Sequence, residues 1–311
     1  MYIYIYIFIK VVAAQLCGDN RAEEFYFFTG RGGNGKSLFA DMMKAALNEG
    51  DTGYFKSFNP ELLTGRAAGA EGVSPVMESL RGRRCVITGE PEHNEKVNIG
   101  LVKRLTGGDT ITARKLHGAP VSFKPQFTPN IMCNDMPDLA HVDGGITRRT
   151  RVIEFEFLFK TQEEIDALKR PDPRWKLIDS VIKGQIASEP GFGQALLFHL
   201  LDVYEANKHI HKHPPPPKVR AVTDAYLLSS NKVAQWLSEF YIVTSDTADR
   251  VTAATLFKEY KADTGDRAML NEAFGREMVK LVERKRMTAG NFYLRLARRD
   301  VAHEDEEDSN D

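Results

Sequence analysis

The stretch from Gly30 to Ser37 combines residue types and spacing that suit phosphate chemistry. It reads G-R-G-G-N-G-K-S, which is the G-x-x-x-x-G-K-S pattern of a phosphate-binding loop. In such a loop the glycines let backbone N–H groups surround the β-phosphate, the lysine reaches the β- and γ-phosphate oxygens, and the serine hydroxyl ligates magnesium. The pattern predicts a magnesium nucleoside triphosphate as ligand. The residues expected to line it are Gly30, Arg31, Gly32, Gly33, Asn34, Gly35, Lys36, Ser37 and Leu38.

Two later apolar runs end in side chains that suit phosphoryl transfer. Residues 85–88 lead into Glu90-Pro91-Glu92, and residues 127–134 end in Asn134. A carboxylate at a strand end can hold the magnesium shell or polarise the attacking water, and an amide beside the γ-phosphate can orient that water. Proline separates the two acids, so the choice between Glu90 and Glu92 as water activator stays open. Ser37 and Glu90 are the expected metal residues.

Basic residues occur in two further places where they can do chemistry. Arg148 and Arg149 precede an alternating strand pattern at 152–157 and could neutralise the phosphoryl group of a neighbouring subunit's nucleotide, although such arginines are commonly surface ion-pair partners. Residues 110–123 read as a hairpin with Lys115 and His117 near its tip. A cation and a histidine there can reach a phosphodiester backbone, and the alternative is a polar surface turn.

These side chains need an α/β scaffold to position them. Phe25–Phe28 is expected to form the strand entering the loop, and apolar residues at helical spacing up to Leu47 predict the helix leaving it. The alternating Tyr and Ile of residues 1–9 predict a strand, because this run is too short to span a membrane and lacks the basic start of a signal peptide. We therefore expect no membrane partner. Residues 11–24 read as a helix and turn, and residues 64–72 as a mobile loop.

The C-terminal half reads mainly as helices. Helical spacing predicts helices across 172–201, two more between 218 and 241, one at 252–262 and one at 271–287, followed by a strand at 291–297. His209, His211 and His213 precede four prolines and read as a linker rather than a metal site. The 271–287 helix would carry a basic face, either solvated or in contact with DNA, formed by Lys280, Arg284, Lys285 and Arg286.

Composition is that of an ordinary globular chain with an unusual end. The 311 residues are 42% apolar and 27% charged, with a formal net charge of −1. Residues 300–311 hold seven acidic residues and no Lys or Arg, so residues 1–299, with 42 basic and 36 acidic residues, carry +6. The acidic run predicts a disordered tail, with a nucleic-acid mimic or partner-binding tail as the alternative. Three widely spaced cysteines argue against a disulfide framework.

The order of these motifs resembles that of superfamily 3 (AAA+) DNA helicases. The quoted segments are GRGGNGKS, the strand ending at Glu90, LVKRLTGGDTITARKLHG, the strand ending at Asn134, and GITRRTRVIEF. They are most similar to the helicase domain of phage, plasmid and large-DNA-virus primase-helicases of the poxvirus type. The likeness is strong over 12–158 and looser over 175–297, and KxLTGGDxIxAR is its most specific part.

The resemblance implies an α/β fold, an AAA+ P-loop core whose central, mostly parallel sheet is flanked by helices. Its parts would be a lead-in (1–22), the ATPase core (23–158), a helical segment with the His/Pro linker (159–240), a winged-helix-like domain (241–299) and a disordered acidic tail (300–311). By motif position, Lys36, Glu90 or Glu92, and Asn134 would be catalytic. Lys103 and Arg114 match the segment after Glu90, and Arg114, Lys115 and His117 would contact DNA. Arg148 would be the trans-acting finger, with Arg149 as substitute.

The implied function is ATP-dependent unwinding of DNA by a homohexameric ring that moves on single-stranded DNA in viral or mobile-element replication. ATP and Mg²⁺ would be the cofactors, and a separate primase or polymerase a partner. The chain would be soluble and intracellular, in the host nucleus or at a cytoplasmic viral replication site. Two alternatives stay open: an RNA-directed motor of the same superfamily, and a catalytically decayed, nucleotide-switched nucleic-acid-binding protein.

Overall fold

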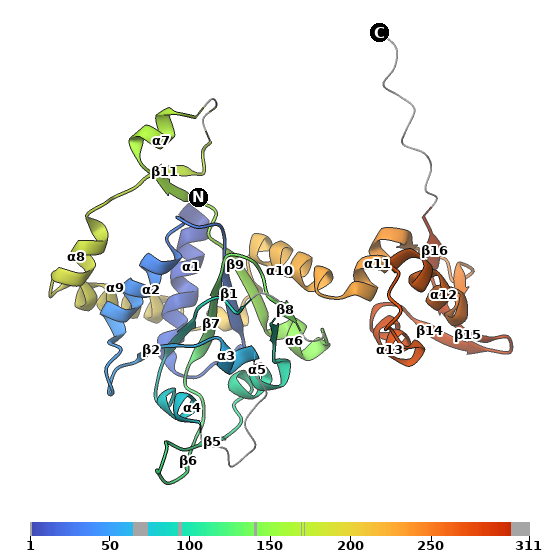
Figure 1. Ribbon diagram of the computed structural model, residues 1–311, viewed down its shortest axis with the longest axis horizontal. Helices are drawn as coiled ribbons and strands as arrows, with labels where there is room; N and C mark the ends of the chain where they lie inside the picture. The colour runs from blue at the N-terminus through green and yellow to red at the C-terminus, as the bar shows by residue number, and fades with distance from the viewer. Residues whose placement is uncertain are drawn as a thin grey trace. The chain divides into compact units, whose positions relative to one another are not determined.

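A five-stranded parallel sheet lies at the centre of the first of two compact units of the computed structural model (Figure 1). The strand order is β2-β3-β7-β1-β9, with bounds Phe55–Phe58, Cys85–Thr88, Thr128–Cys133, Phe25–Thr29 and Thr150–Glu154. β1, β3 and most of β7 are buried, as expected for apolar strands covered on both faces of a parallel sheet. The structure describes residues 2–64, 74–92, 95–139, 142–168, 170 and 172–299.

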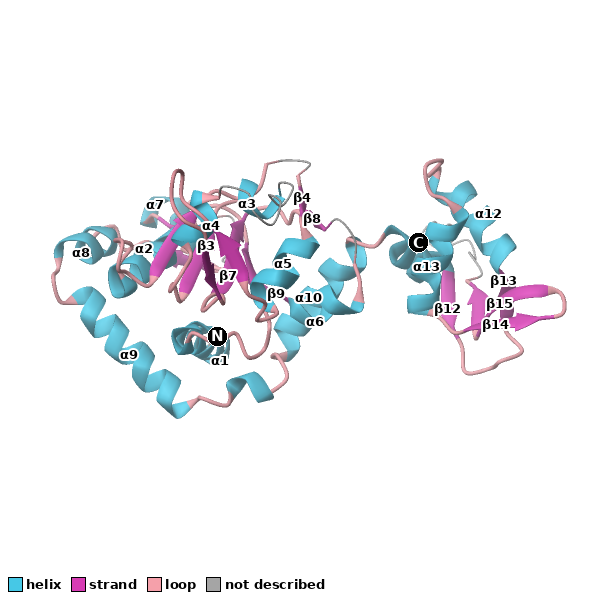
Figure 2. Ribbon diagram, turned by 90° about the horizontal axis from the view of Figure 1, so that it is seen from below, coloured by secondary structure: helices cyan, strands magenta, loops and turns pink. Residues whose placement is uncertain are grey.

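Three helices pack together over one face of this sheet. They are α1 (Tyr2–Ala14), α2 (Lys36–Leu47) and α9 (Phe192–Ala206), and Figure 2 shows α1 beside α9. Their shared core includes Val12 of α1, Met43 of α2 and Leu200 of α9, packed with Phe55, Cys85 and Ile87 of the sheet. The other face receives the ring of Tyr226 from α10 (Pro217–Ser229), which packs on Phe27. The central α/β prediction is confirmed.

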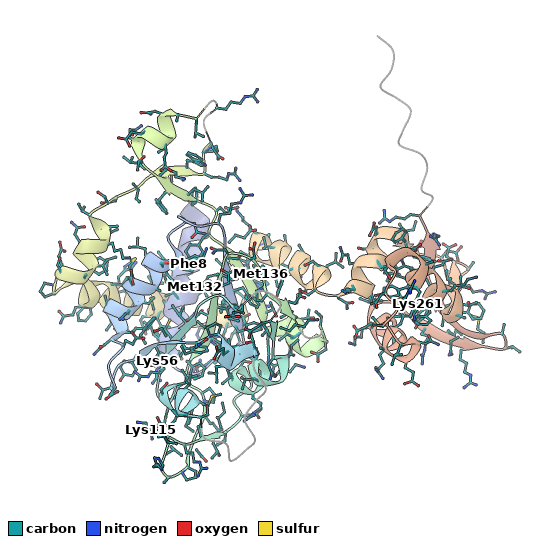
Figure 3. The ribbon with its side chains drawn as sticks, in the orientation of Figure 1. Phe8, Lys56, Lys115, Met132, Met136 and Lys261 are labelled. Atoms are coloured by element: carbon teal, nitrogen blue, oxygen red, sulfur yellow. The ribbon has the colours of Figure 1, made fainter. Side chains whose placement is uncertain are left out.

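The strand predicted for the N-terminus is wrong, because those residues form α1. The Phe8 ring lies edge-on to Phe28 of β1, Phe39 of α2 and Phe155 after β9, with ring centroids 5.0 to 5.6 Å apart. Figure 3 shows Phe8 near Met132 of β7, and both side chains belong to the same core. Local Tyr/Ile alternation favours a strand, but packing of Phe8, Val12 and Ala13 in the core shared with the sheet and α9 stabilises a helix.

Smaller elements surround the core of the first unit. The hairpin predicted at 110–123 is present as β5 (Ile111–Ala113) and β6 (Val121–Phe123). Two short parallel pairs join β4 (Lys96–Val97) to β8 (Asp138–Leu139), and β10 (Leu158–Lys160) to β11 (Trp175–Leu177). The remaining helices and 3-10 turns are η1 (Gln15–Cys17), α3 (Glu61–Thr64), α4 (Pro75–Ser79), α5 (Ile99–Thr106), α6 (Gly144–Arg149), α7 (Gln162–Asp166), α8 (Ile182–Ser188) and η2 (Ile210–Lys212).

The helix expected from residue 172 onward begins later than predicted. Trp175 lies on β11 beside Leu158, so its backbone is extended. Helical structure starts at Ile182 and continues, after a break, in α9. The apolar spacing of 172–178 was therefore misread, because a three-residue strand and one helical turn give similar patterns in so short a window.

The second unit begins at Leu227, within α10, and has its own core. Its elements are α11 (Lys232–Phe240), β12 (Tyr241–Val243), β13 (Arg250–Thr252), α12 (Ala253–Thr264), α13 (Asn271–Leu281), β14 (Arg284–Met287), β15 (Gly290–Leu294) and β16 (Leu296–Arg298). Three helices supply most of the core around Trp236, Tyr260 and Phe274. An antiparallel sheet of order β13-β15-β14 covers it, and β12 pairs with β16.

The long helix predicted at 271–287 is also wrong in its second half. α13 ends at Leu281, and Arg284, Lys285 and Arg286 lie on β14, where they pair with Tyr293, Phe292 and Asn291 of β15. The basic helix face is thus a basic β-hairpin. The expected mobile loop, apart from Thr64, and the acidic tail lie outside the described residues. Among the described helices none is long and apolar enough to cross a membrane.

Candidate nucleotide site

The glycine-rich loop joins β1 to α2 at the carboxyl edge of the sheet. Gly30, Gly33 and Gly35 have φ angles of 139°, 78° and 90°, a region that side chains with a Cβ rarely adopt. At Gly30 a Cβ atom would also lie 2.6 Å from the Phe155 carbonyl oxygen. The loop therefore needs glycine for its path, and its path directs the first turn of α2 toward the same edge.

Lys36 is held inside this loop. Its side chain is buried, and its Nζ donates hydrogen bonds to the Gly30 carbonyl, to Asn34 Oδ1 at 3.3 Å and to Asn134 Oδ1 at 3.1 Å. Burial lowers the pKa of the Lys36 ammonium from its usual value, while the charge of Glu90 opposes that effect. A phosphate placed in the loop would supply the full negative charge that this buried ammonium lacks.

The structure brings Glu90 and Asn134 to this lysine. Glu90 follows β3 and Asn134 follows the neighbouring β7, so their side chains leave the sheet at one edge. Asn134 Nδ2 donates to Glu90 Oε2 at 3.1 Å, and the Asp135 N–H donates to Glu90 Oε1 at 3.0 Å. Lys36, Asn134 and Glu90 thus form one continuous chain of polar contacts.

Glu92 is not part of that chain. Its backbone N–H faces the Glu95 carboxylate, 3.3 Å away, and its exposed carboxylate contacts none of the three residues among those described. Glu90 and Ser37 are both exposed, which suits groups that hold a metal ion between protein and phosphate. Asp135, which sequence reasoning passed over, stands beside Glu90. The only signal for it was its position directly after Asn134.

Arg148 and Arg149 lie at the opposite edge of the sheet. They end α6 directly before β9, whose first residue Thr150 pairs with Phe25 at the start of β1. A five-residue strand such as β1 spans about 16 Å, so neither arginine can reach the loop at the other end of its own strand. Both donate to Glu23 Oε2 at 2.5 Å, but the Arg148 side chain is 55% exposed and that of Arg149 only 10%.

Arg149 has further partners inside the unit. Its Nε donates to Thr106 Oγ1 at 3.1 Å and its Nη1 to the Gly145 carbonyl at 3.0 Å. Lys103, on the same α5 as Thr106, pairs with Asp143, the residue that caps α6, at 2.5 Å. The LVKRLTGG segment therefore clamps α6 in place through side-chain contacts from α5. The sequence did not predict this role.

The hairpin residues lie away from both the glycine-rich loop and the two arginines. Lys115 is 70% exposed and lies 3.5 Å from Glu78, and Figure 3 shows it at the far end of the hairpin. His117 is exposed with a φ of 59°, an uncommon value for histidine, and Leu116 between them is 66% exposed. Arg114 is half-buried, and its Nε has no partner among the described residues.

The segment after β9 also contacts the glycine-rich loop, which the sequence did not predict. The Phe159 N–H of β10 donates to the Gly33 carbonyl at 2.8 Å, and Asn34 Nδ2 donates to the Phe155 carbonyl at 3.3 Å. The chain after β9 therefore returns to the glycine-rich loop. By contrast, a cavity of about 730 Å³ beside α1 and the His/Pro segment is lined by no residue of the loop.

Sequence relatives come from large DNA viruses and a virophage. A protein of Acanthamoeba polyphaga mimivirus with the provisional name of helicase is 37% identical over 47% of this chain and 15% of its own length. Proteins with the same kind of name from Frog virus 3 and Sputnik virophage are 27% and 25% identical over 89% and 82% of this chain. The chain covers only 28% and 32% of those two proteins, and no family model matches.

Solved structures show the same fold. The apo structure of the NrS-1 C-terminal region aligns over 94% of this chain and 71% of its own, with a TM-score of 0.51 and 14% identity. A second apo form aligns with the same TM-score over 92% of this chain. The chain is thus a homologue of the provisionally named helicases of large DNA viruses, built on an α/β core like that of a P-loop NTPase.

Proposed function

We propose that this chain is the ATP-hydrolysing motor of a DNA helicase of the superfamily 3, AAA+ type. The single observation that carries the proposal is the contact chain Lys36–Asn134–Glu90 at the mouth of a glycine-rich loop. In this site Lys36 neutralises the charge of the β- and γ-phosphates, Asn134 orients the attacking water, and Glu90 activates that water. Mg²⁺ supplies charge neutralisation on the phosphates when bound, with Ser37 and Glu90 as its holders.

The placement of Arg148 supports a site shared between subunits. Its guanidinium is exposed at the sheet edge opposite its own loop, so it serves a triphosphate only if another copy presents one. A head-to-tail contact of this kind generates a closed ring when the rotation closes, and we propose a homohexamer. We assign the finger to Arg148 and not to Arg149, because Arg149 is buried among its own subunit's groups.

The β5–β6 hairpin is the proposed contact with single-stranded DNA. Its exposed Lys115 and His117 can bind the phosphate backbone without reading bases, and Arg114 lies where β5 ends and the connecting loop begins. Hydrolysis would change the angle between subunits and shift the hairpin along the strand. Such binding is sequence-tolerant and weakens with salt.

The second unit supports a winged-helix-like domain. Helices α11, α12 and α13 are followed by the β14–β15 hairpin, and a three-stranded antiparallel sheet closes the unit. The hairpin corresponds to a wing, and the side chains of Lys285 and Arg286 on it are exposed and form no ion pair within the described residues. We propose that this basic wing contacts nucleic acid backbone in support of the motor.

The test is ATP turnover by the purified chain with and without single-stranded DNA, beside Lys36→Ala. We expect Lys36→Ala to abolish turnover, because it removes the charge that the triphosphate needs; undiminished turnover in this variant would refute the assignment. Stimulation by RNA but not DNA would support the RNA-directed alternative. ATP binding without phosphate release would support the decayed switch protein, and a separate primase or polymerase remains the proposed partner.

A further inference from the structure

β10 runs along the outer side of the glycine-rich loop and places an aromatic ring there. The Phe159 backbone N–H is fixed by its bond to the Gly33 carbonyl at 2.8 Å. The ring lies so close to Gly35 that a Cβ atom on that glycine would meet Phe159 Cε2 at 3.3 Å. Phe159 therefore contacts the loop twice, with its backbone N–H at Gly33 and with its ring at Gly35.

This ring is not used as core. Phe159 is 39% exposed and belongs to none of the described hydrophobic clusters, and in the described part of the chain no other aromatic ring packs on it. Covering the exposed part of the ring would contribute about 25 cal/mol per Å², so this ring offers apolar surface to a ligand held by the loop. Among the side chains whose burial is described, Tyr54 and Phe198 are also exposed aromatic rings, and neither is among the atoms that lie against the loop glycines.

β11, the strand paired with β10, places a positive charge near the ring. Phe159 pairs in register with Lys176 of β11, and the Lys176 ammonium stands 5.3 Å from the centroid of the Phe157 ring. Lys176 forms no ion pair within the described residues. Two aromatic rings and one uncompensated cation thus line the strand that borders the phosphate loop.

We propose that Phe159 stacks on the base of the nucleoside triphosphate whose phosphates the loop binds. This inference rests on the proposed function and adds its base contact. A triphosphate bound at residues 30–37 leaves its nucleoside beside the loop, where the partly exposed ring of Phe159 is an aromatic surface within reach. Stacking on a ring face uses no hydrogen-bonding edge of the base, so adenine and guanine nucleotides are bound through the same contact.

The experiment measures binding of Mg-ATP, Mg-GTP and Mg-tripolyphosphate to the full chain by calorimetry. We expect Phe159→Ala to weaken ATP and GTP about 10-fold each and to leave tripolyphosphate, which has no base, unchanged. Phe159→Tyr should keep wild-type affinity, since its ring still stacks. Phe159→Leu, which keeps apolar bulk against Gly35, should resemble Phe159→Ala. Phe198→Ala, which removes another exposed aromatic ring from the same unit, is the matched control.

Three results overturn the proposal. Equal loss of ATP and tripolyphosphate in Phe159→Ala, with rescue by leucine, would show that the ring only supports the loop. Unchanged ATP affinity in Phe159→Ala would show that the base lies elsewhere. Wild-type protein that binds neither ligand would remove the nucleotide site itself, so failure of the proposed function is distinguished from failure of the stacking contact.

Discussion

Complementation between two inactive variants tests the shared site most directly. Arg148→Ala keeps an intact loop and lacks the finger, whereas Lys36→Ala keeps the finger and lacks a working loop. Removal of a trans-acting arginine lowers turnover by roughly 10³- to 10⁵-fold in related chemistry, so each variant alone should be inactive. In rings mixed at equal amounts, one half of the loops and one half of the fingers are intact. Independent random pairing then restores about one quarter of wild-type turnover.

The structure makes Arg148→Ala a clean perturbation. Its side chain is 55% exposed and its partner Glu23 keeps the bond to Arg149, so the lost surface pair costs the fold only about 0.5 kcal/mol. Loss of turnover in this variant therefore reports on chemistry and not on unfolding. Unchanged melting of the variant is the required control.

The assay is phosphate release on single-stranded DNA at fixed total protein, over the full range of mixing ratios. A mixture that stays as inactive as its components would refute the shared site, because a finger acting on its own subunit's nucleotide cannot be supplied by a neighbour. In a mixture of Arg148→Ala with wild-type protein every loop is intact and only the fingers are diluted, so the same independent pairing predicts turnover that falls in proportion to the variant's share. A decline steeper than this would contradict independent pairing.

Three further variants separate the remaining roles. Arg149→Ala should destabilise the first unit by about 3 kcal/mol, seen as a lowered midpoint in urea, because it removes a buried guanidinium that bonds Glu23, the buried Thr106 hydroxyl and the Gly145 carbonyl. Lys115→Ala should keep basal ATP turnover but lose its stimulation by single-stranded DNA, since Lys115 is exposed on the hairpin and remote from the loop. The double variant Lys285→Ala/Arg286→Ala should weaken DNA binding measured without ATP. It should also make the slope of log K against log salt for duplex DNA shallower by about 1.8, the value for two lost phosphate contacts.

Two of these variants have a matched control in the chain. Lys124→Ala removes an exposed lysine just beyond β6, and it should leave DNA stimulation intact. Lys258→Ala/Arg267→Ala removes the same charge from the second unit away from β14, and equal weakening by this pair would mean that the wing has no special role. Wild-type stability of Arg149→Ala would contradict the clamp described for α6.

Local patterns were sufficient where chemistry and backbone constraint coincide. GRGGNGKS predicted the phosphate loop between a strand and a helix, because glycines readily adopt the positive φ angles found at Gly33 and Gly35 and the lysine after them is the residue that binds phosphate. The strands before Glu90 and Asn134 were found from short apolar runs, since buried parallel strands have few polar positions. The segment that contains α5 was noticed by its resemblance to a known family, but its contacts with Arg149 of α6 were not predicted.

The same reasoning failed where distant segments determine local conformation. The Tyr/Ile run has strand propensity, yet it is a helix because Phe8 is packed by rings from β1, α2 and the chain after β9. Residues 282–287 continue a helical spacing, yet they turn into β14 because β15 offers a partner strand. Neither partner is visible within a window of the sequence.

The amino-acid sequence by itself determined the phosphate loop, the strands that enter and flank it, and the kinds of side chain available for hydrolysis. Only the tertiary structure decided that Glu90 and not Glu92 meets Asn134, that Arg148 faces away from its own loop, and that Phe159 returns to it. The physical reason is that glycine angles and apolar runs act over a few residues. Contacts between strand ends depend on the order in which parallel strands are placed in the sheet, and that order is set by packing across the whole unit.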